Sequence, residues 1–314
     1  MHALITGITG FAGAHLAEYL VARGDQVSGT SRRATWSVDV PASLAGQVDL
    51  LKWDVSQPAT DGITARIAKS APDCIFHLAA MSVPSDCGRD VPTPRAIATN
   101  VAGTRHVAEL AASLPRMPRV VLLSSCYVYA PVSTDNPLVD ESAPLAPQSA
   151  YGITKRDAER VLLEMAQERG LSVIVARAFQ HTGPRQSPRM FVPQWARQFA
   201  LGGENPVEVV RLDTFLDLSD VRDVVRAYRA LAEQGEPGRV YNVGSGECRR
   251  SGDIFERLRE LAGSSRSAVE SSPGMRQHPI ADITRISAHT GWRPEIPLDT
   301  TLADVLAFWK TRVA

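Results

Sequence analysis

The chain has little of what would tie it to a membrane or to an oxidising compartment. It has only four cysteines in 314 residues, and none forms a CxxC pair. So few thiols exclude a disulfide framework and favour a reducing cytosol. No apolar run is long enough to span a bilayer, and the first run leads directly into Thr6-Gly7, which leaves no room for a signal peptide. We therefore expect a soluble, unprocessed, cytoplasmic protein.

An excess of charge of one sign is also missing. Lys and Arg number 34, and so do Asp and Glu. Without a net field the chain is not expected to bind nucleic acid or an anionic membrane surface, so its ligand must be recognised locally. The length suits one large α/β unit, or a nucleotide-binding domain with a smaller companion.

What is present is a regular alternation of short apolar runs and helical patterns. The runs at residues 3–6, 26–30, 48–53, 74–78, 120–124 and 172–176 predict buried strands. Residues 15–23, 63–70, 98–113 and 151–169 have the apolar spacing of helices. Strand followed by helix, repeated, predicts an α/β fold with a Rossmann-type doubly wound parallel sheet.

After Ala176 the alternation stops, and glycines and prolines break the chain into shorter elements. We expect a smaller C-terminal α/β lobe that binds the substrate, formed by residues 180–214 and 245–314. Residues 1–179 are then the Rossmann-type domain, and residues 215–244 return to it through a strand at 240–243.

A glycine-rich turn lies between the first predicted strand and the first predicted helix, at Gly7, Gly10 and Gly13. Glycines allow a tight turn and close backbone approach, and the helix N-terminus offers free N–H groups to a pyrophosphate. This context predicts a bound dinucleotide rather than a turn that serves packing alone.

The second predicted strand ends at Ser31-Arg32-Arg33, where a chain that selects NAD usually has an acidic residue. No acid is present there. A guanidinium is well shaped for a 2′-phosphate, so the sequence favours NADP over NAD. Asp54, after the third strand, is placed to accept a hydrogen bond from the adenine amino group, or else to cap the strand end.

Tyr151 and Lys155 are four residues apart and therefore share one face of a helix. An ammonium beside a phenol favours the ionised phenol, which makes the tyrosine a usable proton shuttle. The spacing alone is common, so its meaning depends on the rest of the chain.

From Ala3 to about Trp309 the chain resembles the extended short-chain dehydrogenase/reductase family. The motifs that carry the resemblance occur in order at residues 6–13, 54–55, 77–80, 100–104, 124–125, 128–129, 151–155, 183–184, 220–223, 241–244 and 291–294. Most members act on nucleotide-diphosphate sugars. Residues 30–32, 177–184 and 220–228 resemble most closely the GDP-6-deoxy-4-keto-mannose reductases and the GDP-mannose 4,6-dehydratases.

The resemblance implies that Tyr151 is the acid/base, that Lys155 lowers its pKa and holds the nicotinamide ribose, and that Ser125 or Ser124 binds the reacting oxygen. Ser125 fits the motif better. The expected cofactor residues are Gly7, Thr9, Gly10, Phe11, Ala12, Gly13, Ser31, Arg32, Arg33, Asp54, Val55, Leu78, Ala79, Ala80, Asn100, Tyr151, Lys155 and Ala178. The expected substrate residues are Ser82, Ser125, Cys126, Tyr127, Gln180, Arg185, Arg211 and Arg276. No metal is expected.

The dehydratases of this family have a Glu, often after an Asp, where this chain has Cys126-Tyr127. A phenol, with an unperturbed pKa of about 10, is a poor base at neutral pH, so dehydration is not expected. The GDP-fucose synthases use a Cys near this point and a His from the second lobe. Cys126 is one residue out of register, and Met190 or Phe191 stands where the His would fall.

What remains is hydride and proton transfer at one carbon. The prediction is NADPH-dependent reduction of the 4-keto group of a nucleotide-diphosphate 6-deoxyhexose, giving a GDP-deoxyhexose such as GDP-D-rhamnose, with Tyr151 as proton donor. One alternative is a nucleotide-sugar 4-epimerase with tightly bound NAD(P). Another is a non-catalytic, redox-sensing dinucleotide-binding protein, although such relatives tend to lose the Tyr or the Lys.

Several positions that contact the sugar nucleotide in relatives are altered. Gln180 replaces an Asn, and Leu216 and Ser272 each replace an Arg. Either other arginines compensate, with Arg185, Arg189, Arg211 and Arg276 as candidates, or the ligand carries less negative charge. Members of the family commonly dimerise through the helices expected here at 98–113 and 151–169, so we expect a homodimer.

Overall fold

The architecture is a large parallel sheet with helices on both faces, in a computed structural model that describes residues 1–313. Seven strands lie in the order β11-β7-β5-β4-β1-β2-β3, and every neighbouring pair is parallel. They are β1 (His2–Thr6), β2 (Gln26–Ser31), β3 (Asp49–Lys52), β4 (Cys74–His77), β5 (Arg119–Ser125), β7 (Val173–Ala178) and β11 (Val240–Val243). The doubly wound sheet predicted from the sequence is confirmed.

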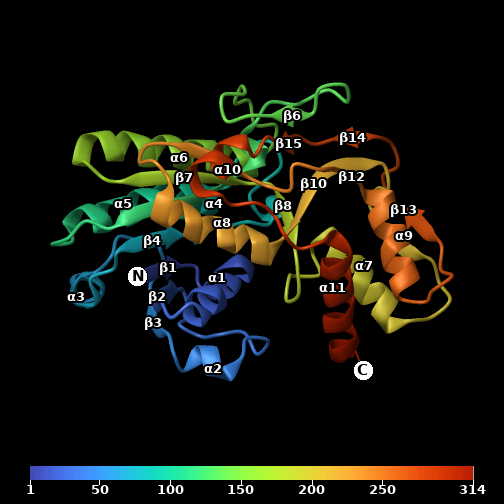
Figure 1. Cartoon of the computed structure of the whole chain (residues 1–314), viewed down its shortest axis with the longest axis horizontal. Coiled ribbons are helices and arrows are strands. Elements are labelled where there is room, and N and C mark those ends of the chain that lie inside the picture. The colour runs from blue at the N-terminus through green and yellow to red at the C-terminus, as the bar shows by residue number, and fades with distance from the viewer. Residues whose placement is uncertain (314) are drawn as a thin grey trace.

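The helices on the two faces enclose separate apolar clusters (Figure 1). One face is covered by α1 (Phe11–Ala22), α8 (Val221–Gln234) and α10 (Thr284–Thr290), with α2 (Ala42–Ala45) at its edge. The other is covered by α3 (Asp61–Ser70), α5 (Gly103–Ser113) and α6 (Ala150–Arg169). Leu4 and Ile5 belong to different clusters, because successive side chains of a strand point to opposite faces.

Two helix boundaries differ from the expected ones. α1 begins at Phe11 rather than at His15, because the glycine turn leads directly into the helix. The segment expected as one helix at 98–113 opens with α4 (Pro94–Ala96) and a π-helical turn, η2 (Ile97–Ala102), before α5. Short 3₁₀ turns, η1 (Pro84–Asp86) and η3 (Cys126–Val128), follow β4 and β5.

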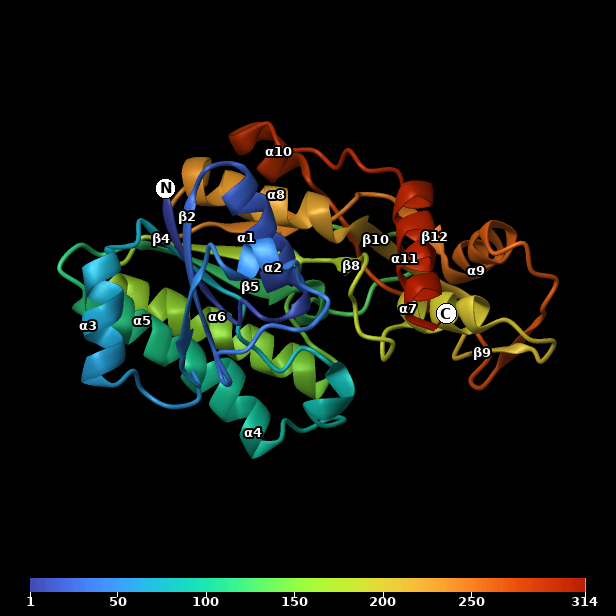
Figure 2. The ribbon, with the colours of Figure 1, turned by 90° about the horizontal axis from the view of Figure 1, so that it is seen from below.

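A second lobe gathers at the end of the molecule opposite the N-terminus (Figure 2). Its helices α7 (Phe191–Leu201), α9 (Ser251–Leu261) and α11 (Leu298–Val313) share a third apolar cluster, which includes Trp195 and Leu302. Two short strands, β9 (Val207–Val209) and β13 (Ala268–Glu270), pair at its edge.

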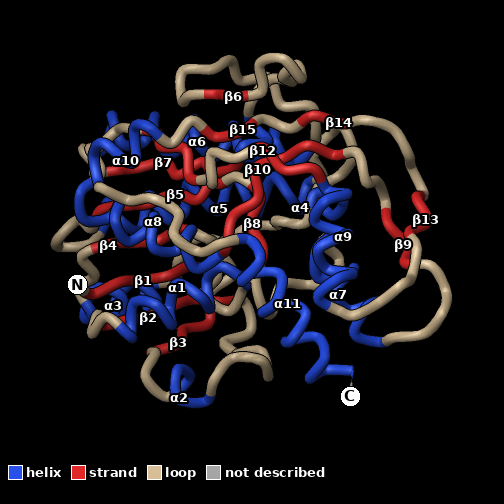
Figure 3. The backbone as a smooth tube through the Cα atoms, turned by 45° about the vertical axis from the view of Figure 1, so that its right-hand side comes forward, coloured by secondary structure: helices blue, strands red, loops and turns tan. Residues whose placement is uncertain are grey.

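A small sheet lies between the large sheet and these helices (Figure 3). In it β10 (Thr214–Asp220) pairs with β8 (Gln180–Thr182), β12 (Cys248–Arg250) and β14 (Arg276–Gln277). Of residues 215–244, therefore, α8 and β11 join the large sheet, whereas β10 does not. Ile286 and Trp292, expected in the second lobe, are packed in the cluster of α1 and α8.

The last pair of strands, β6 (Leu138–Val139) and β15 (Ile280–Ala281), joins the loop after η3 to the segment before α10. Across residues 1–313, the structure contains no helix that is both long enough and apolar enough to cross a membrane.

Candidate active site

The turn between β1 and α1 is shaped for the close approach of a ligand. Gly7 has a φ of 70°, and a Cβ there would lie 2.7 Å from the backbone nitrogen of Ala79, so only glycine is accommodated. Gly10 precedes α1 and supplies no side-chain cap. The first N–H groups of the helix are therefore left for another acceptor, which fits the pyrophosphate of a dinucleotide.

Beside this turn, at the carboxyl ends of the parallel strands, lies a cavity of about 420 Å³. Its lining includes most of the predicted cofactor residues and one predicted substrate residue: Gly7, Thr9, Gly10, Phe11, Ala12, Gly13, Ser31, Arg32, Asp54, Val55, Leu78, Ala79, Ala80, Ser82, Tyr151, Lys155 and Ala178. Ligands of open α/β sheets bind at this edge. We call this hollow the sheet cavity.

The sheet cavity continues into a hollow of about 630 Å³ that Arg32 and Arg33 line together with Trp36. The turn that carries both arginines is held by Ser31, whose hydroxyl accepts a hydrogen bond from the Ala34 N–H at 3.0 Å. Ala34 has a left-handed φ of 49°, and both arginines are exposed. Two exposed guanidiniums on a turn held by Ser31 suit a 2′-phosphate.

Asn100 lies behind the wall of the sheet cavity rather than in it. Its side-chain oxygen accepts from the Met81 N–H at 2.7 Å, and its amide nitrogen donates to the Thr154 hydroxyl at 2.9 Å. The amide is fully committed to these partners and is buried. The expected cofactor contact from Asn100 is therefore not seen; the residue instead fixes the segment after β4 to α6.

Tyr151 and Ser125 lie together where β5 meets α6. Burial raises the pKa of Tyr151 above that of a free phenol, and the Ser125 hydroxyl beside it partly opposes this rise. Ser124, the alternative to Ser125, has its hydroxyl engaged with the buried Glu159 carboxylate. The geometry therefore pairs Ser125, and not Ser124, with the phenol.

Lys155 is expected from the sequence to lower the pKa of Tyr151, and this stays a prediction. Its ammonium donates to the Leu123 carbonyl at 2.7 Å, and burial of the phenol dominates the pKa of Tyr151. Burial also lowers the pKa of Lys155 to about 8, while Glu159 opposes that shift. The lysine is thus mostly charged at neutral pH, and the phenol is protonated.

Tyr127 forms the wall next to Tyr151. The two rings meet edge to face, with centroids 5.8 Å apart. The close approach requires Gly152, since a Cβ there would lie 2.2 Å from the Tyr127 carbonyl oxygen. Cys126 is buried beside Gln180, which raises the pKa of the thiol, and its sulfur lies 3.8 Å from the Gln180 side-chain oxygen. Within the described chain, the Gln180 Nε2 is a buried donor without a partner.

A second cavity, of about 130 Å³, opens in the second lobe and is lined by Phe191, Trp195, Val210, Arg211, Thr214, Leu216, Ser251, Arg276 and His278. It brings together two of the predicted substrate residues, Arg211 and Arg276. The buried indole N–H of Trp195 has no hydrogen-bond partner in residues 1–313. We call this hollow the lobe cavity.

His278 connects the lobe cavity to the catalytic residues. Its ring lies edge to face against Tyr127 with centroids 5.7 Å apart, on the way from the lobe cavity to Tyr151. Burial, together with Arg276 and Arg211, lowers the pKa of His278 to about 4, so the imidazole is neutral. The sequence gave no motif for this residue.

The altered arginine positions are explained in part by their neighbours. Arg211 donates to the backbone oxygen of Ser272 at 3.0 Å and to its hydroxyl at 3.1 Å, so a guanidinium is present next to this serine. Leu216 lines the lobe cavity. Arg189 is paired with Asp86 at 2.6 Å.

Arg185 lies outside the lining of both cavities. It forms an ion pair with Glu18 on α1, and its Nη2 approaches the His15 Nδ1 at 3.0 Å. The backbone of Arg185 is left-handed, with a φ of 72°, and its charge is balanced by Glu18. The expected substrate contact from Arg185 is therefore not seen.

Several residues that line the sheet cavity were not expected from the sequence: Trp53, Met81, Thr99, Leu123, His181 and Tyr228; Ser124, the alternative triad serine, lines it as well. Of these, His181 stacks on Phe11, with ring centroids 6.0 Å apart and an interplanar angle of 9°. Its place in the short segment between β7 and Gly183-Pro184, within β8, was the only available signal in the sequence. Residues 1–313 contain no cluster of three or more potential metal ligands.

The chain is similar to a known family over most of its length. The model of the NAD dependent epimerase/dehydratase family matches residues 3–244. The chain is 29% identical to the GDP-6-deoxy-D-mannose reductase of Pseudomonas aeruginosa, over 98% of this chain and 97% of that protein. It is 28% identical to the dTDP-glucose 4,6-dehydratase of Streptomyces griseus, over 98% of this chain and 94% of that protein.

Among solved structures, the fold is similar to that of RMD from Pseudomonas aeruginosa in complex with NADPH. The TM-score is 0.84, the sequence identity is 27%, and the match covers 99% of both chains. The similarity thus extends through both the large sheet and the second lobe.

Proposed function

The chain belongs to the NAD dependent epimerase/dehydratase family, and from this premise we propose that it reduces the 4-keto group of a GDP-linked 4-keto-6-deoxyhexose with NADPH. Its relatives are NAD(P)-dependent oxidoreductases of the extended short-chain dehydrogenase/reductase type that modify nucleotide sugars. The two relatives named above are a reductase and a dehydratase, so the residues of the site are needed to distinguish between these two reactions.

The observation that carries the proposal is that, among the described residues, no carboxylate lines the sheet cavity beside Tyr151. Among the described residues that line the two cavities, Asp54 is the only acid, and it follows β3 at the far edge of the sheet. Dehydration requires a base that removes a carbon-bound proton and an acid for the leaving hydroxyl. Cys126 and Tyr127 occupy that place, and burial raises the pKa of both. Reduction needs neither group.

The residues at the end of β5 suit a single proton transfer to a ketone. Tyr151 is held protonated by burial, so its O–H donates to the substrate oxygen as negative charge develops there. Ser125 lies beside the phenol and supplies a second hydrogen bond to that oxygen. Lys155 stabilises the resulting phenolate and binds the ribose next to it.

The residues of the sheet cavity fit NADPH, which supplies the hydride when bound. The glycine turn and the N-terminus of α1 hold the pyrophosphate. Arg32 and Arg33 bind the 2′-phosphate, which NAD lacks. A basic turn with no acid at this position supports NADPH as the cofactor, and a reductant consumed in each cycle supports a reductase over an epimerase.

The second lobe supplies the charge for the sugar nucleotide. Arg211 and Arg276 line the lobe cavity and take the place of the arginines missing at 216 and 272. The indole N–H of Trp195 and the amide nitrogen of Gln180 have no hydrogen-bond partner among residues 1–313, so each can donate to an acceptor on the substrate. Tyr127 and His278 form the wall along which the sugar extends toward Tyr151.

The test is oxidation of NADPH, followed by its absorbance, with GDP-4-keto-6-deoxy-mannose and with dTDP- and UDP-linked 4-keto sugars. We expect turnover with the GDP sugar, faster with NADPH than with NADH, and a deoxyhexose as product by NMR. Failure with every 4-keto nucleotide sugar would sink the proposal. Interconversion of nucleotide sugars without added cofactor would instead establish the 4-epimerase.

A further inference from the structure

A third ionisable side chain follows Tyr151 and Lys155 on the same face of α6. Glu159 lies four residues after Lys155 and eight after Tyr151, and residues at this spacing are stacked along one side of a helix. Only 3% of Glu159 is exposed. A carboxylate is rarely buried to this extent unless it is paired, and the function described above gives it no task.

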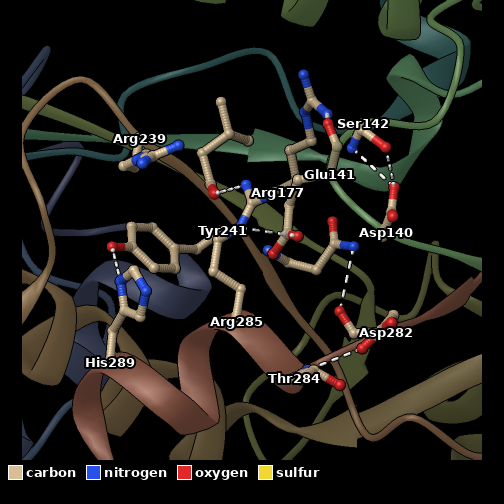
Figure 4. Close-up of polar contacts among 12 residues, drawn as sticks. Asp140, Glu141, Ser142, Arg177, Arg239, Tyr241, Asp282, Thr284, Arg285 and His289 are labelled. Atoms are coloured by element: carbon tan, nitrogen blue, oxygen red, sulfur yellow. Dashed lines mark hydrogen bonds and ion pairs between the residues drawn. The ribbon is translucent and has the colours of Figure 1, made fainter.

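The partners of Glu159 come from the two central strands. Arg177 on β7 donates from Nε at 3.0 Å and from Nη2 at 2.8 Å to the two carboxylate oxygens. Ser124 on β5 donates its hydroxyl to Oε1. Arg177 continues outward to the Tyr129 hydroxyl at 3.1 Å and to the Glu141 carbonyl at 3.2 Å. Figure 4 shows Arg177 beside Glu141 and Arg285 in this polar network.

These contacts fix the end of β5 that carries the catalytic serine. Ser124, bound to Glu159, directly precedes Ser125. Leu123, one residue earlier, accepts the hydrogen bond from Lys155 at 2.7 Å. α6 thus holds two successive residues of β5, Leu123 and Ser124, through two of its own polar side chains, and the position of Ser125 against Tyr151 depends on both.

The charges around Lys155 come from four elements. Tyr151 and Glu159 are on α6, Cys87 follows η1, His77 is on β4 and Arg177 is on β7. Burial raises the pKa of Tyr151 and of Cys87 and lowers that of His77, so these three are neutral at pH 7. Glu159 is the carboxylate in this set, and it forms an ion pair with Arg177 at 2.8 Å.

We propose that Glu159 is a positioning residue for the transfer, which keeps Lys155 charged and, through Ser124, places Ser125 against Tyr151. The ion pair with Arg177 does not cancel this effect, because the carboxylate lies on the same helix face as the ammonium whereas Arg177 approaches from the strand. Part of this role concerns catalysis and so rests on the proposed function; the charge of Lys155 can be tested without it.

The test measures the affinity for NADPH against pH by fluorescence titration of the full chain. In the wild type the affinity falls as the pH rises through about 8, because the Lys155 cation is lost there. In Glu159→Gln the midpoint moves down by about one pH unit, the lower end of what loss of a neighbouring opposite charge gives. In Glu159→Gln/Arg177→Gln, which removes both charges, the midpoint lies between these two.

Glu164→Gln is the matched control. It removes the same charge from the same helix, but Glu164 is 47% exposed and paired with Arg160, so the wild-type midpoint is expected. A purely structural role for Glu159 would weaken binding equally at every pH. A folded Glu159→Gln protein, verified by circular dichroism, with the wild-type midpoint would overturn the proposal. If that variant does not fold, a wild-type midpoint in the double variant overturns it.

The two proposals fail separately. Absence of turnover with every 4-keto nucleotide sugar would remove the proposed reductase activity, while the pH midpoint of cofactor binding would still report on Glu159. With an active enzyme, Ser124→Ala is expected to lower kcat about ten-fold through Ser125 and to leave the midpoint in place, since it alters no charge.

Discussion

Tyr151 carries the proton in the proposed reaction, and its surroundings decide the direction in which it works. Burial raises the pKa of this phenol, and the lysine four residues away is bonded to a backbone carbonyl. The tyrosine is therefore a donor before it is a base. Reduction of a ketone begins with a donor, whereas oxidation of an alcohol begins with a base.

Tyr151→Phe is expected to lower kcat for NADPH-dependent reduction by about 10²–10⁴-fold, the range that general acid catalysis supplies. The affinity for NADPH should change little, because the phenyl ring still fills its place beside Tyr127. Stopped-time product analysis and fluorescence titration measure the two quantities separately. Retained turnover would show that another group donates the proton.

Arg32 and Arg33, which follow β2, should determine the preference for NADPH over NADH. Arg32→Ala/Arg33→Ala is expected to weaken NADPH binding by about 10²–10⁴-fold, since two charge-assisted hydrogen bonds to a phosphate are lost and each contributes about 1.5–3 kcal/mol when formed. Binding of NADH serves as the internal control and should be unaltered. Equal losses for both cofactors would contradict a role in 2′-phosphate recognition.

Among single residues, site residues were predicted best where the course of the backbone alone brings them to the cavity. The glycine turn, Ser31, Asp54 and Ala178 all line the sheet cavity, because strand ends place them there whatever their side chains do. Long or amide side chains were harder to place. Arg185 reaches back to Glu18, and Asn100 turns away to Met81, since partners far apart in sequence determine where such side chains lie.

Among the elements, the contact between η3 and α6 is the most demanding. Gly152→Ala would put a Cβ 2.2 Å from the Tyr127 carbonyl, so the helix and the turn must move apart. We expect a loss of about 1–3 kcal/mol in the free energy of unfolding, as for other overpacked sites, and a fall in kcat larger than the change in NADPH affinity.

Gly62→Ala provides the comparison for Gly152→Ala. Gly62 lies in α3, where an added Cβ meets nothing closer than 4.0 Å, so this change should leave activity alone and stabilise slightly. Urea unfolding and steady-state kinetics on both variants measure the difference. Equal behaviour of the two would mean that the contact between Tyr127 and α6 is not tight in solution.

The seven strands of the large sheet were predicted to within two residues at each end, because a buried parallel strand is a short apolar run bounded by polar residues. The π-helical turn η2 was not predicted. Its extra residue leaves the apolar spacing of the helix almost unchanged, yet it carries Asn100, whose amide joins Met81 to Thr154. A one-residue bulge of this kind is specified by such tertiary contacts.

For the whole molecule, the third apolar cluster is separate from the two that cover the large sheet. Leu302→Ala, in α11 and fully buried, is expected to lower the free energy of unfolding by about 2–5 kcal/mol. Because α11 packs on α7, which lines the lobe cavity, the KM for the nucleotide sugar should rise while NADPH affinity stays the same.

Leu110→Ala in α5 is the matched variant for Leu302→Ala. It removes a buried leucine from a cluster on the large sheet, so a similar loss of stability should leave the KM for the sugar unchanged. Denaturant unfolding and kinetics distinguish the two. A rise in KM in both variants would contradict independent lobes.

The dimer expected through α5 and α6 stays a prediction, which sedimentation would test.

The two cavities share no lining residue: Tyr127 lines neither of them and contacts Tyr151 of the sheet cavity and His278 of the lobe cavity. Mutations of residues that line only the lobe cavity can therefore alter which sugar nucleotide is accepted without disturbing the dinucleotide. In the evolution of such enzymes, the two linings can therefore change independently. The choice of electron donor can remain constant while new substrates are acquired, and an engineer can alter the lining of one cavity and keep that of the other.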